Sequence, residues 1–157
     1  MGATESIELA TILVTDLVGS TRLETSVGPV RADELRDEHF AVLREAIGAS
    51  GGREFKDTGD GLMVAFSSAS AAVTCAVSMQ QLIERRYRRA EQQLQVRIGV
   101  SAGESTVKDG NYFGLPSIEA ARLCARPRRT GSWSHPRCAC SPAGSTESGS
   151  IRSASSR

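Results

Sequence analysis

Two aspartates, Asp16 and Asp60, stand at the ends of apolar runs and could organise chemistry between them. Asp60 lies in a polar turn, residues 56–61, where a glycine flanks it on each side and an apolar run follows. The Asp-Gly pair favours the tip of a β-hairpin, and one such aspartate alone is commonly explained by turn chemistry. Asp16 ends a second apolar run, and two carboxylates at strand ends favour a functional pair over two unrelated turns.

The residues after Asp16 are typical of an anion site. The segment 16–21 reads DLVGST, in which Ser20 and Thr21 are good N-cap residues for a following helix. A helix N-terminus offers free N–H groups and a partial positive charge, so strand, acid, glycine turn and helix start predict a triphosphate cradle. The segment is not a P-loop, because no Gly-Lys-Ser/Thr follows.

Hydrophobic periodicity predicts the elements that must position these residues. The expected elements are a buried strand over residues 7–15, a helix over 32–47, a hairpin over 52–66, a helix over 72–83 and a strand over 94–100. His39 and Cys75 fall on the apolar faces of the two helices, so we expect both to be packing residues. The order β-α-β-β-α-β predicts an α+β, ferredoxin-like fold with helices on one face of an antiparallel sheet.

Composition bounds the class of protein. The chain has 157 residues, 39% of them hydrophobic, which is enough for the core of one domain. No run approaches a membrane span, and residues 1–8 lack the pattern of a signal peptide, so we expect a cytoplasmic protein. The arginine run at 85–89 suits a solvated helix end better than nucleic-acid binding.

Charge divides the chain unevenly. Residues 1–125 hold 13 Lys and Arg and 17 Asp and Glu, whereas residues 126–157 hold six Arg and a single Glu. The last segment also has nine Ser, one Ile and no Lys, without helical or strand periodicity. We therefore expect an N-terminal extension over residues 1–9, one domain over 10–125, and an unpatterned, disordered tail over 126–157.

Four motifs carry a resemblance to a known family. They are TILVTDLVGST at residues 11–21, KDTGDG at 56–61, VRIGVSAGE at 96–104, and YFG with AAR at 112–114 and 120–122. In this order and with these gaps, the chain resembles the class III adenylyl and guanylyl cyclase catalytic domain over about residues 10–125. The resemblance ends at about Ala125 and implies a cyclase fold with an incomplete C-terminal part.

The resemblance implies a phosphorus–oxygen lyase that converts ATP, or GTP, to a cyclic nucleotide and pyrophosphate. Asp16 and Asp60 match the family's ligands for two Mg²⁺ or Mn²⁺ ions, with the Leu17 carbonyl as a further ligand. The amides of residues 18–21, which are Val18, Gly19, Ser20 and Thr21, match those that hold the terminal phosphates. Such sites form between two chains, so a homodimer or a heterodimer with a related chain is implied.

The base-binding positions match only in part. Lys56 falls where adenylyl cyclases carry the lysine that donates to adenine, and Asn111 occupies the position of their aspartate. An amide acceptor contributes ~0.5–1.5 kcal/mol where a charged one contributes ~1.5–3 kcal/mol. The resemblance therefore implies adenine as the preferred base, with weaker discrimination against guanine.

Positions 118 and 122 differ in how well they match the family's catalytic residues. Arg122 matches the family's transition-state arginine, whereas Ile118 stands where an asparagine orients the ribose. The phosphate-binding lysine of the family has no counterpart after residue 125. We expect impaired or absent activity, and we expect that the tail cannot supply the missing strands of the sheet. An out-of-frame origin of the tail is a hypothesis that the other reading frames of the encoding DNA would test.

Two other functions remain open. The chain could be an inactive cyclase-like module that binds nucleotide and dimerises with a competent partner. The run GGREF at residues 51–55 is similar to the Gly-Gly-Asp/Glu-Glu-Phe signature of diguanylate cyclases, but Arg53 replaces its required acid.

Overall fold

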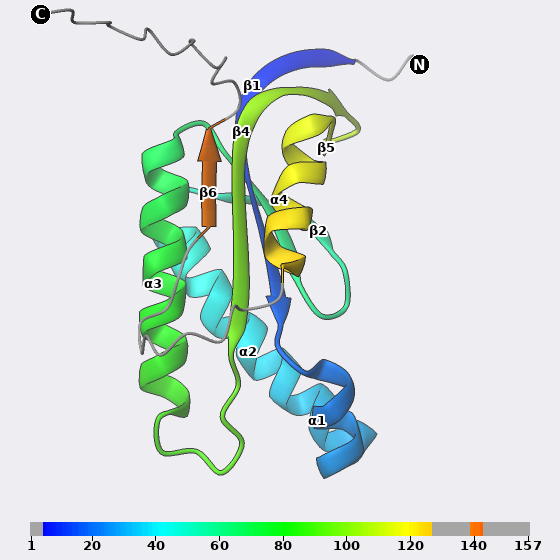
Figure 1. Ribbon diagram of the computed structural model, residues 1–157, viewed down its shortest axis with the longest axis vertical. Coiled ribbons are helices and arrows are strands. Elements are labelled where there is room, and N and C mark those ends of the chain that lie inside the picture. Colours follow the sequence, from blue (N-terminus) through cyan, green and yellow to red (C-terminus); the bar gives the residue numbers. More distant parts are fainter. Residues whose placement is uncertain (1–4, 127–138, 143–157) are drawn as a thin grey trace, which may run out of the picture.

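A sheet with β1 at its centre organises the computed structural model, which describes residues 5–126 and 139–142. β1 (Ser6–Leu17) pairs antiparallel with β3 (Leu62–Phe66) on one side and with β4 (Val96–Lys108) on the other. β2 (Arg53–Asp57) pairs with β3, and β5 (Asn111–Phe113) pairs with the end of β4. The resulting order is β2-β3-β1-β4-β5. Figure 1 shows β1 and β4 side by side.

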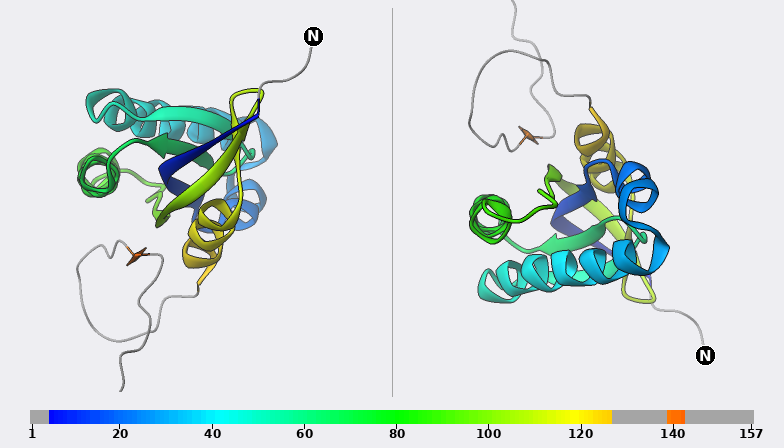
Figure 2. Two further views of the ribbon diagram at one scale, coloured as in Figure 1. Left: turned by 90° about the horizontal axis from the view of Figure 1, so that it is seen from above. Right: turned by 90° about the horizontal axis from the view of Figure 1, so that it is seen from below.

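Four helices accompany the sheet within the described part of the chain. They are α1 (Ser20–Val27), α2 (Pro29–Ala49), α3 (Ala69–Tyr87) and α4 (Leu115–Ala125). The two long helices, α2 and α3, lie on one face of the sheet, while α4 lies on the other (Figure 2). The predicted β-α-β-β-α-β order and α+β class are confirmed, and α4 adds a cover on the face opposite the two long helices.

The larger part of the core lies between the sheet and the helices α2 and α3. Alternate residues of β1, Leu13 and Leu17, enter this core together with buried residues of both helices. His39 on α2 and Cys75 on α3 are fully buried in it, which confirms that both are packing residues. The intervening β1 residues Ile12 and Val14 face the other way, toward α4.

α4 packs close to the sheet because β4 carries a glycine beneath it. A Cβ at Gly99 would lie 2.1 Å from the carbonyl oxygen of Ala120 and 2.6 Å from the amide nitrogen of Cys124. Ala120 and Cys124 are themselves buried against β1. Any side chain at position 99 would push α4 away from the sheet, so the glycine sets the distance between them.

The C-terminal segment contains a strand that the sequence analysis did not predict. β6 (Ala139–Pro142) pairs parallel with residues 99–102 of β4, on the edge that β5 leaves open. The expectation that the tail cannot supply strands is wrong for these four residues. Unpaired N–H and C=O groups on an open edge need partners, and four residues are too few to show a recognisable periodicity. The rest of the predicted tail, residues 127–138 and 143–157, lies outside the described residues.

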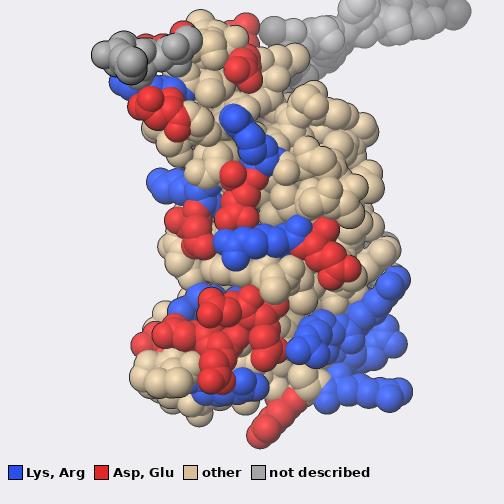
Figure 3. Space-filling view, turned by 180° about the vertical axis from the view of Figure 1, so that it is seen from behind, with Lys and Arg blue, Asp and Glu red and all other residues tan. Residues whose placement is uncertain are grey.

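Acidic and basic side chains lie close to one another on the face seen in Figure 3. Ion pairs among the described residues include Arg31 with Glu34 at 2.8 Å and Arg86 with Glu38 at 3.0 Å. Arg86 belongs to the arginine run at the end of α3, so at least part of this run is engaged within the chain. Among the helices of the described residues, none has both the length and the apolarity needed to cross a membrane.

Candidate active site

Asp16 is the penultimate residue of β1 and lies on the α4 side of the sheet. Its carboxylate is 26% exposed and accepts hydrogen bonds from Arg97 of β4, with 2.9 Å between Nε of Arg97 and Oδ2 of Asp16. Nη2 of Arg97 bonds the same oxygen. Asp16 and Arg97 are direct partners in the β1–β4 register. The strand continues through Asp16, where the sequence predicted its end.

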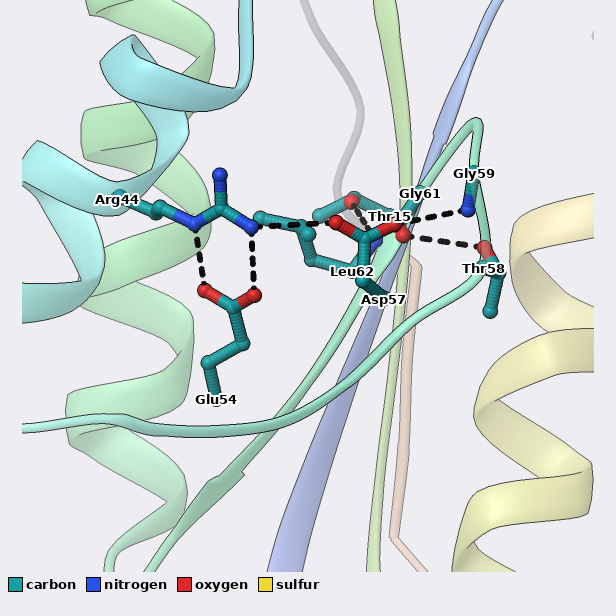
Figure 4. Close-up of polar contacts among 8 residues, drawn as sticks. All are labelled: Thr15, Arg44, Glu54, Asp57, Thr58, Gly59, Gly61 and Leu62. Atoms are coloured by element: carbon teal, nitrogen blue, oxygen red, sulfur yellow. Dashed lines mark hydrogen bonds and ion pairs between the residues drawn. The ribbon is translucent and has the colours of Figure 1, made fainter. Parts of the chain in front are cut away.

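Asp60 lies in the turn between β2 and β3, and this turn is joined to the end of β1. The amide of Leu17, next to Asp16, donates to the carbonyl oxygen of Asp60 at 2.8 Å. The amide of Leu62 donates to Oγ1 of Thr15 at 2.9 Å (Figure 4). A Cβ at Gly61 would lie 1.9 Å from the carbonyl oxygen of Thr15, so only glycine allows the turn to approach β1 this closely. The predicted hairpin is confirmed.

The thiol of Cys124 indicates that both carboxylates lie near the end of α4. Burial is the largest cause that raises the pKa of Cys124 to about 12, and the negative charges of Asp16 and Asp60 act in the same direction. The Cys124 thiol donates to the carbonyl oxygen of Arg97 at 3.4 Å, which places α4 directly over the Asp16–Arg97 pair. Asp16 of β1 and Asp60 of the β2–β3 turn therefore lie near each other, next to Cys124 of α4.

This pair, Asp16 with Asp60, suits hard divalent ions in its donor chemistry. Carboxylate oxygens are the preferred ligands of Mg²⁺ and Mn²⁺, and both side chains are partly exposed. Within the part of the chain that the structure describes, no group of three or more His, Cys, Asp and Glu side chains forms a metal cluster. Two protein carboxylates leave positions for water and substrate phosphate, which is how Mg²⁺ is commonly held at phosphoryl-transfer sites.

The start of α1 follows directly from the end of β1. Gly19 is the N-cap, with a left-handed φ of 73°, and no side chain caps the helix. Ser20 and Thr21 lie inside the helix, so the prediction that they are capping residues is wrong: the glycine makes the sharp turn that the strand-to-helix connection requires. The Val18 amide donates to the carbonyl oxygen of Gln95 at 2.9 Å and is engaged within the fold. The first-turn amides of α1, Ser20 and Thr21 among them, have no intrahelical partner.

Lys56 and Asn111 come from strands that meet on the α4 side. Lys56 of β2 is exposed, and Asn111 of β5 donates from its side chain to the carbonyl oxygen of Asp109 at 3.3 Å. The two strands are in contact next to these residues. The rings of Phe55 and Tyr112 lie with their centroids 5.2 Å apart, and Nη2 of Arg53 donates to the Tyr112 hydroxyl at 2.8 Å.

Ile118 and Arg122 are one turn apart on α4. Positions i and i+4 lie on the same side of a helix, and both side chains are exposed, Ile118 at 49%. Arg122 has no ion pair among the described residues, so its guanidinium is available to an anion. Both side chains are therefore open to a molecule that approaches α4.

Arg97 is the residue that sequence reasoning missed. Its neighbours Val96 and Ile98 point into the core below α3, so the alternation of the strand does place Arg97 on the opposite face. That it stands opposite Asp16 depends on the register between two strands whose paired residues are 81 positions apart, and the sequence holds no direct signal for this register. The pair gives the site a fixed cation beside one of its two carboxylates.

Comparisons with known proteins agree on one family. The family model described as the adenylate and guanylate cyclase catalytic domain matches residues 3–109. A Rhizobium meliloti protein named "Putative adenylate cyclase 3" is 38% identical over 125 residues, covering 77% of this chain and 21% of that protein. An adenylate cyclase of Streptomyces coelicolor is 30% identical over 108 residues, covering 69% of this chain and 27% of that protein. The chain thus spans about a fifth to a quarter of the length of these two curated relatives.

A solved structure from Silicibacter pomeroyi, an adenylate/guanylate cyclase/hydrolase, superposes with a TM-score of 0.69 at 31% identity, covering 78% of this chain and 72% of that one. The adenylyl cyclase CyaB of P. aeruginosa shares the fold, with the same TM-score at 21% identity over 78% of this chain and 74% of that one. The match of the family model to most of the described domain, and to both aspartates within it, shows that the chain belongs to the adenylate and guanylate cyclase catalytic domain family.

Proposed function

We propose that this chain supplies one half of an adenylyl-type cyclase site, in which ATP is converted to cyclic AMP and pyrophosphate. The observation that carries the proposal is the convergence of Asp16 and Asp60 beneath α4, tied together by the hydrogen bond from the Leu17 amide to the Asp60 carbonyl. The relatives named as adenylate cyclases support adenine as the base.

In this reaction the ribose 3′-oxygen attacks the α-phosphorus and pyrophosphate leaves. Two Mg²⁺ or Mn²⁺ ions, held by Asp16, Asp60 and the Leu17 carbonyl, would supply positive charge to the attacking and leaving oxygens. The free amides at the start of α1 lie next in the chain and would donate hydrogen bonds to the terminal phosphates. The Val18 amide is not available for this role, because it donates to the carbonyl oxygen of Gln95.

The remaining groups would act across an interface between two chains. Lys56 would donate to the base, Asn111 would accept from its amino group, and Arg122 would offset charge on the α-phosphate. Three exposed apolar side chains at the β5–α4 junction, Phe113, Leu115 and Ile118, are 54%, 57% and 49% exposed and support contact with a second chain there.

One observation favours a second candidate, an inactive module that binds nucleotide and pairs with a competent cyclase chain. Ile118 points outward on the same side of α4 as Arg122, but it has no group that can orient a ribose. Loss of a positioning hydrogen bond can reduce the rate by ~10²-fold or more. A diguanylate cyclase is disfavoured, because Arg53 is engaged with Tyr112 and offers no carboxylate.

Product analysis distinguishes these functions. The chain is incubated with ATP or GTP and Mn²⁺, and products are separated by chromatography, with Asp60→Ala as the inactive control. An adenylyl cyclase forms cyclic AMP from ATP, weakly in the parent chain and faster after Ile118→Asn. An inactive module binds Mn²⁺-ATP in equilibrium dialysis without product even after Ile118→Asn. Failure to bind Mn²⁺-ATP at all would overturn the proposal.

A further inference from the structure

A chain of polar contacts links α2 to the turn that carries Asp60. Arg44 of α2 forms two parallel hydrogen bonds with Glu54 of β2, with Nε–Oε2 and Nη2–Oε1 distances of 2.8 and 2.7 Å. Its Nη2 also reaches Oδ2 of Asp57 at 3.2 Å (Figure 4). The guanidinium lies over the ring of Phe40, with 5.6 Å between its carbon and the ring centroid. Three neighbours therefore fix the position of this cation.

Asp57 connects Arg44 to the turn that carries Asp60. Its second oxygen, Oδ1, accepts a hydrogen bond from the amide of Gly59 at 2.8 Å, one residue before Asp60 (Figure 4). Inside the turn, the amide and Oγ1 of Thr58 both donate to the carbonyl oxygen of Gly61, at 2.9 and 3.0 Å. Both oxygens of Asp57 are thus engaged, one with Arg44 and one with the Gly59 amide, and its carboxylate holds the backbone that carries Asp60.

The contribution of this network to stability is small. Arg44 and Asp57 are each 46% exposed, and Glu54 is 26% exposed. Exposed ion pairs contribute little to the free energy of unfolding, because solvent screens them. The position of a metal ligand, in contrast, must be fixed to within a fraction of an ångström. The residues that hydrogen-bond to the ligand or to its backbone therefore commonly control the affinity for the metal.

We propose that Arg44 and Asp57 are positioning residues for the candidate metal ligand Asp60, and that they set the affinity of the carboxylate pair for divalent ions. This inference rests on the proposed function. It predicts that a change on α2, outside the active-site face, alters metal affinity through Asp57 and the Gly59 amide.

The test measures Mn²⁺ affinity of the full 157-residue chain by isothermal titration calorimetry, with amide exchange at Gly59 as a metal-independent readout. We expect Asp57→Ala to weaken Mn²⁺ binding about tenfold and to speed exchange at Gly59. Asp57→Asn keeps an acceptor for the Gly59 amide but loses its charge, so it should have an intermediate effect. Arg44→Gln should weaken Mn²⁺ binding about threefold, and Arg44→Lys less.

The double variant and a matched control make the test specific. Because Arg44 acts through Asp57, Arg44→Gln combined with Asp57→Ala should bind Mn²⁺ no more weakly than Asp57→Ala alone. Arg31→Gln removes another exposed ion pair of α2, with Glu34, and should leave Mn²⁺ affinity unchanged. Asp57 variants that bind Mn²⁺ like the parent would overturn this inference alone, whereas a parent chain that does not bind Mn²⁺ would overturn the proposed function with it.

Discussion

At the scale of single residues, Arg97 makes the two candidate metal carboxylates unequal. Asp16 is paired with a guanidinium whose side chain is 34% exposed, whereas Asp60 has no ion pair among the described residues. Removal of the Asp16 carboxylate would leave the guanidinium of Arg97 without its partner, whereas removal of the Asp60 carboxylate would leave no cation unpaired.

The two alanine variants should therefore differ. Asp60→Ala should lose Mn²⁺ binding while its free energy of unfolding stays within about 0.5 kcal/mol of the parent. Asp16→Ala should also lose Mn²⁺ binding but should cost about 1 kcal/mol of stability, since a partly buried cation loses its partner. Calorimetric titration with Mn²⁺ and urea unfolding measure the two effects. Restoration of stability by Arg97→Ala in the Asp16→Ala chain would support the pair, and Mn²⁺ binding by both single variants would falsify the metal assignment.

The base-binding residues give a second prediction at this scale. Asn111→Asp should increase the preference for ATP over GTP by about fivefold, because a charged acceptor replaces a neutral one. Lys56→Ala should weaken ATP binding while Mn²⁺ affinity is unchanged. Both residues would contact one base, so their effects should not add. Competition between ATP and GTP in equilibrium dialysis measures the preference, and an unchanged ratio in Asn111→Asp would argue against this placement of the base.

At the scale of elements, the docking of α4 on β4 determines how closely the helix covers the candidate site. The helix lies directly over Gly99, and its Cys124 thiol contacts the carbonyl of Arg97. A shift of α4 would move Ile118 and Arg122 relative to the carboxylate pair. The distance between helix and strand is therefore as important for the site as the identity of the residues on α4.

Gly99→Ala tests this docking. The added methyl group would overlap the backbone of Ala120 and Cys124, so we expect a loss of about 1–3 kcal/mol in the free energy of unfolding. Gly48→Ala is the matched control, because a Cβ at Gly48 meets nothing within 4 Å, and alanine in a helix should raise stability by about 0.5–1 kcal/mol. Urea unfolding of both variants measures the difference. Equal stabilities of Gly99→Ala and the parent would contradict the close approach of α4.

The elements that could be predicted are those in which apolar residues recur at the period of a helix or a strand. β1, α2 and α3 carry such patterns, and the Asp60 hairpin carries its turn residues, so these elements follow from local sequence. The pairing of Arg97 with Asp16 depends on strand register, and β6 depends on an open edge of β4 elsewhere in the chain. The N-cap at Gly19 was missed because two good capping residues follow it, while the sharpness of the turn favoured the glycine.

At the scale of the whole molecule, the two faces of the sheet differ in how they are covered. The face under α2 and α3 holds most of the buried side chains, including His39, whereas the α4 side leaves large apolar residues exposed. The first face accounts for most of the stability of the domain, and the second presents the candidate site. Stability should therefore respond to changes in the core between α2 and α3 without a matching change in metal affinity at neutral pH.

The buried histidine gives this core a predictable dependence on pH. His39 is fully buried beside Phe40 and Tyr87, with ring-centroid distances of 6.2 and 6.3 Å, and neither imidazole nitrogen has a hydrogen-bond partner among the described residues. Burial lowers the pKa of His39 to about 4, while the unfolded chain titrates near the ordinary value of 6.5. The unfolded state then binds a proton that the folded state does not, so His39 reduces stability as pH falls from 6.5 to about 4, and the effect levels off below that range.

The expected loss from this one group is about 2 kcal/mol between pH 8 and pH 5. Carboxylates also titrate near the acid end of this range, so the measurement compares the parent with His39→Leu, which keeps an apolar side chain in the core and removes the titrating group. The difference between the two unfolding free energies should change by about 2 kcal/mol between pH 8 and pH 5. The His39→Leu chain should become more stable relative to the parent as pH falls. Because His39 lies on the opposite side of the sheet from the carboxylate pair, Mn²⁺ affinity at pH 7.5 should be the same in both chains. Parallel pH profiles for the two chains would show that the imidazole is hydrated in solution and that the packing between α2 and α3 is looser than the structure describes.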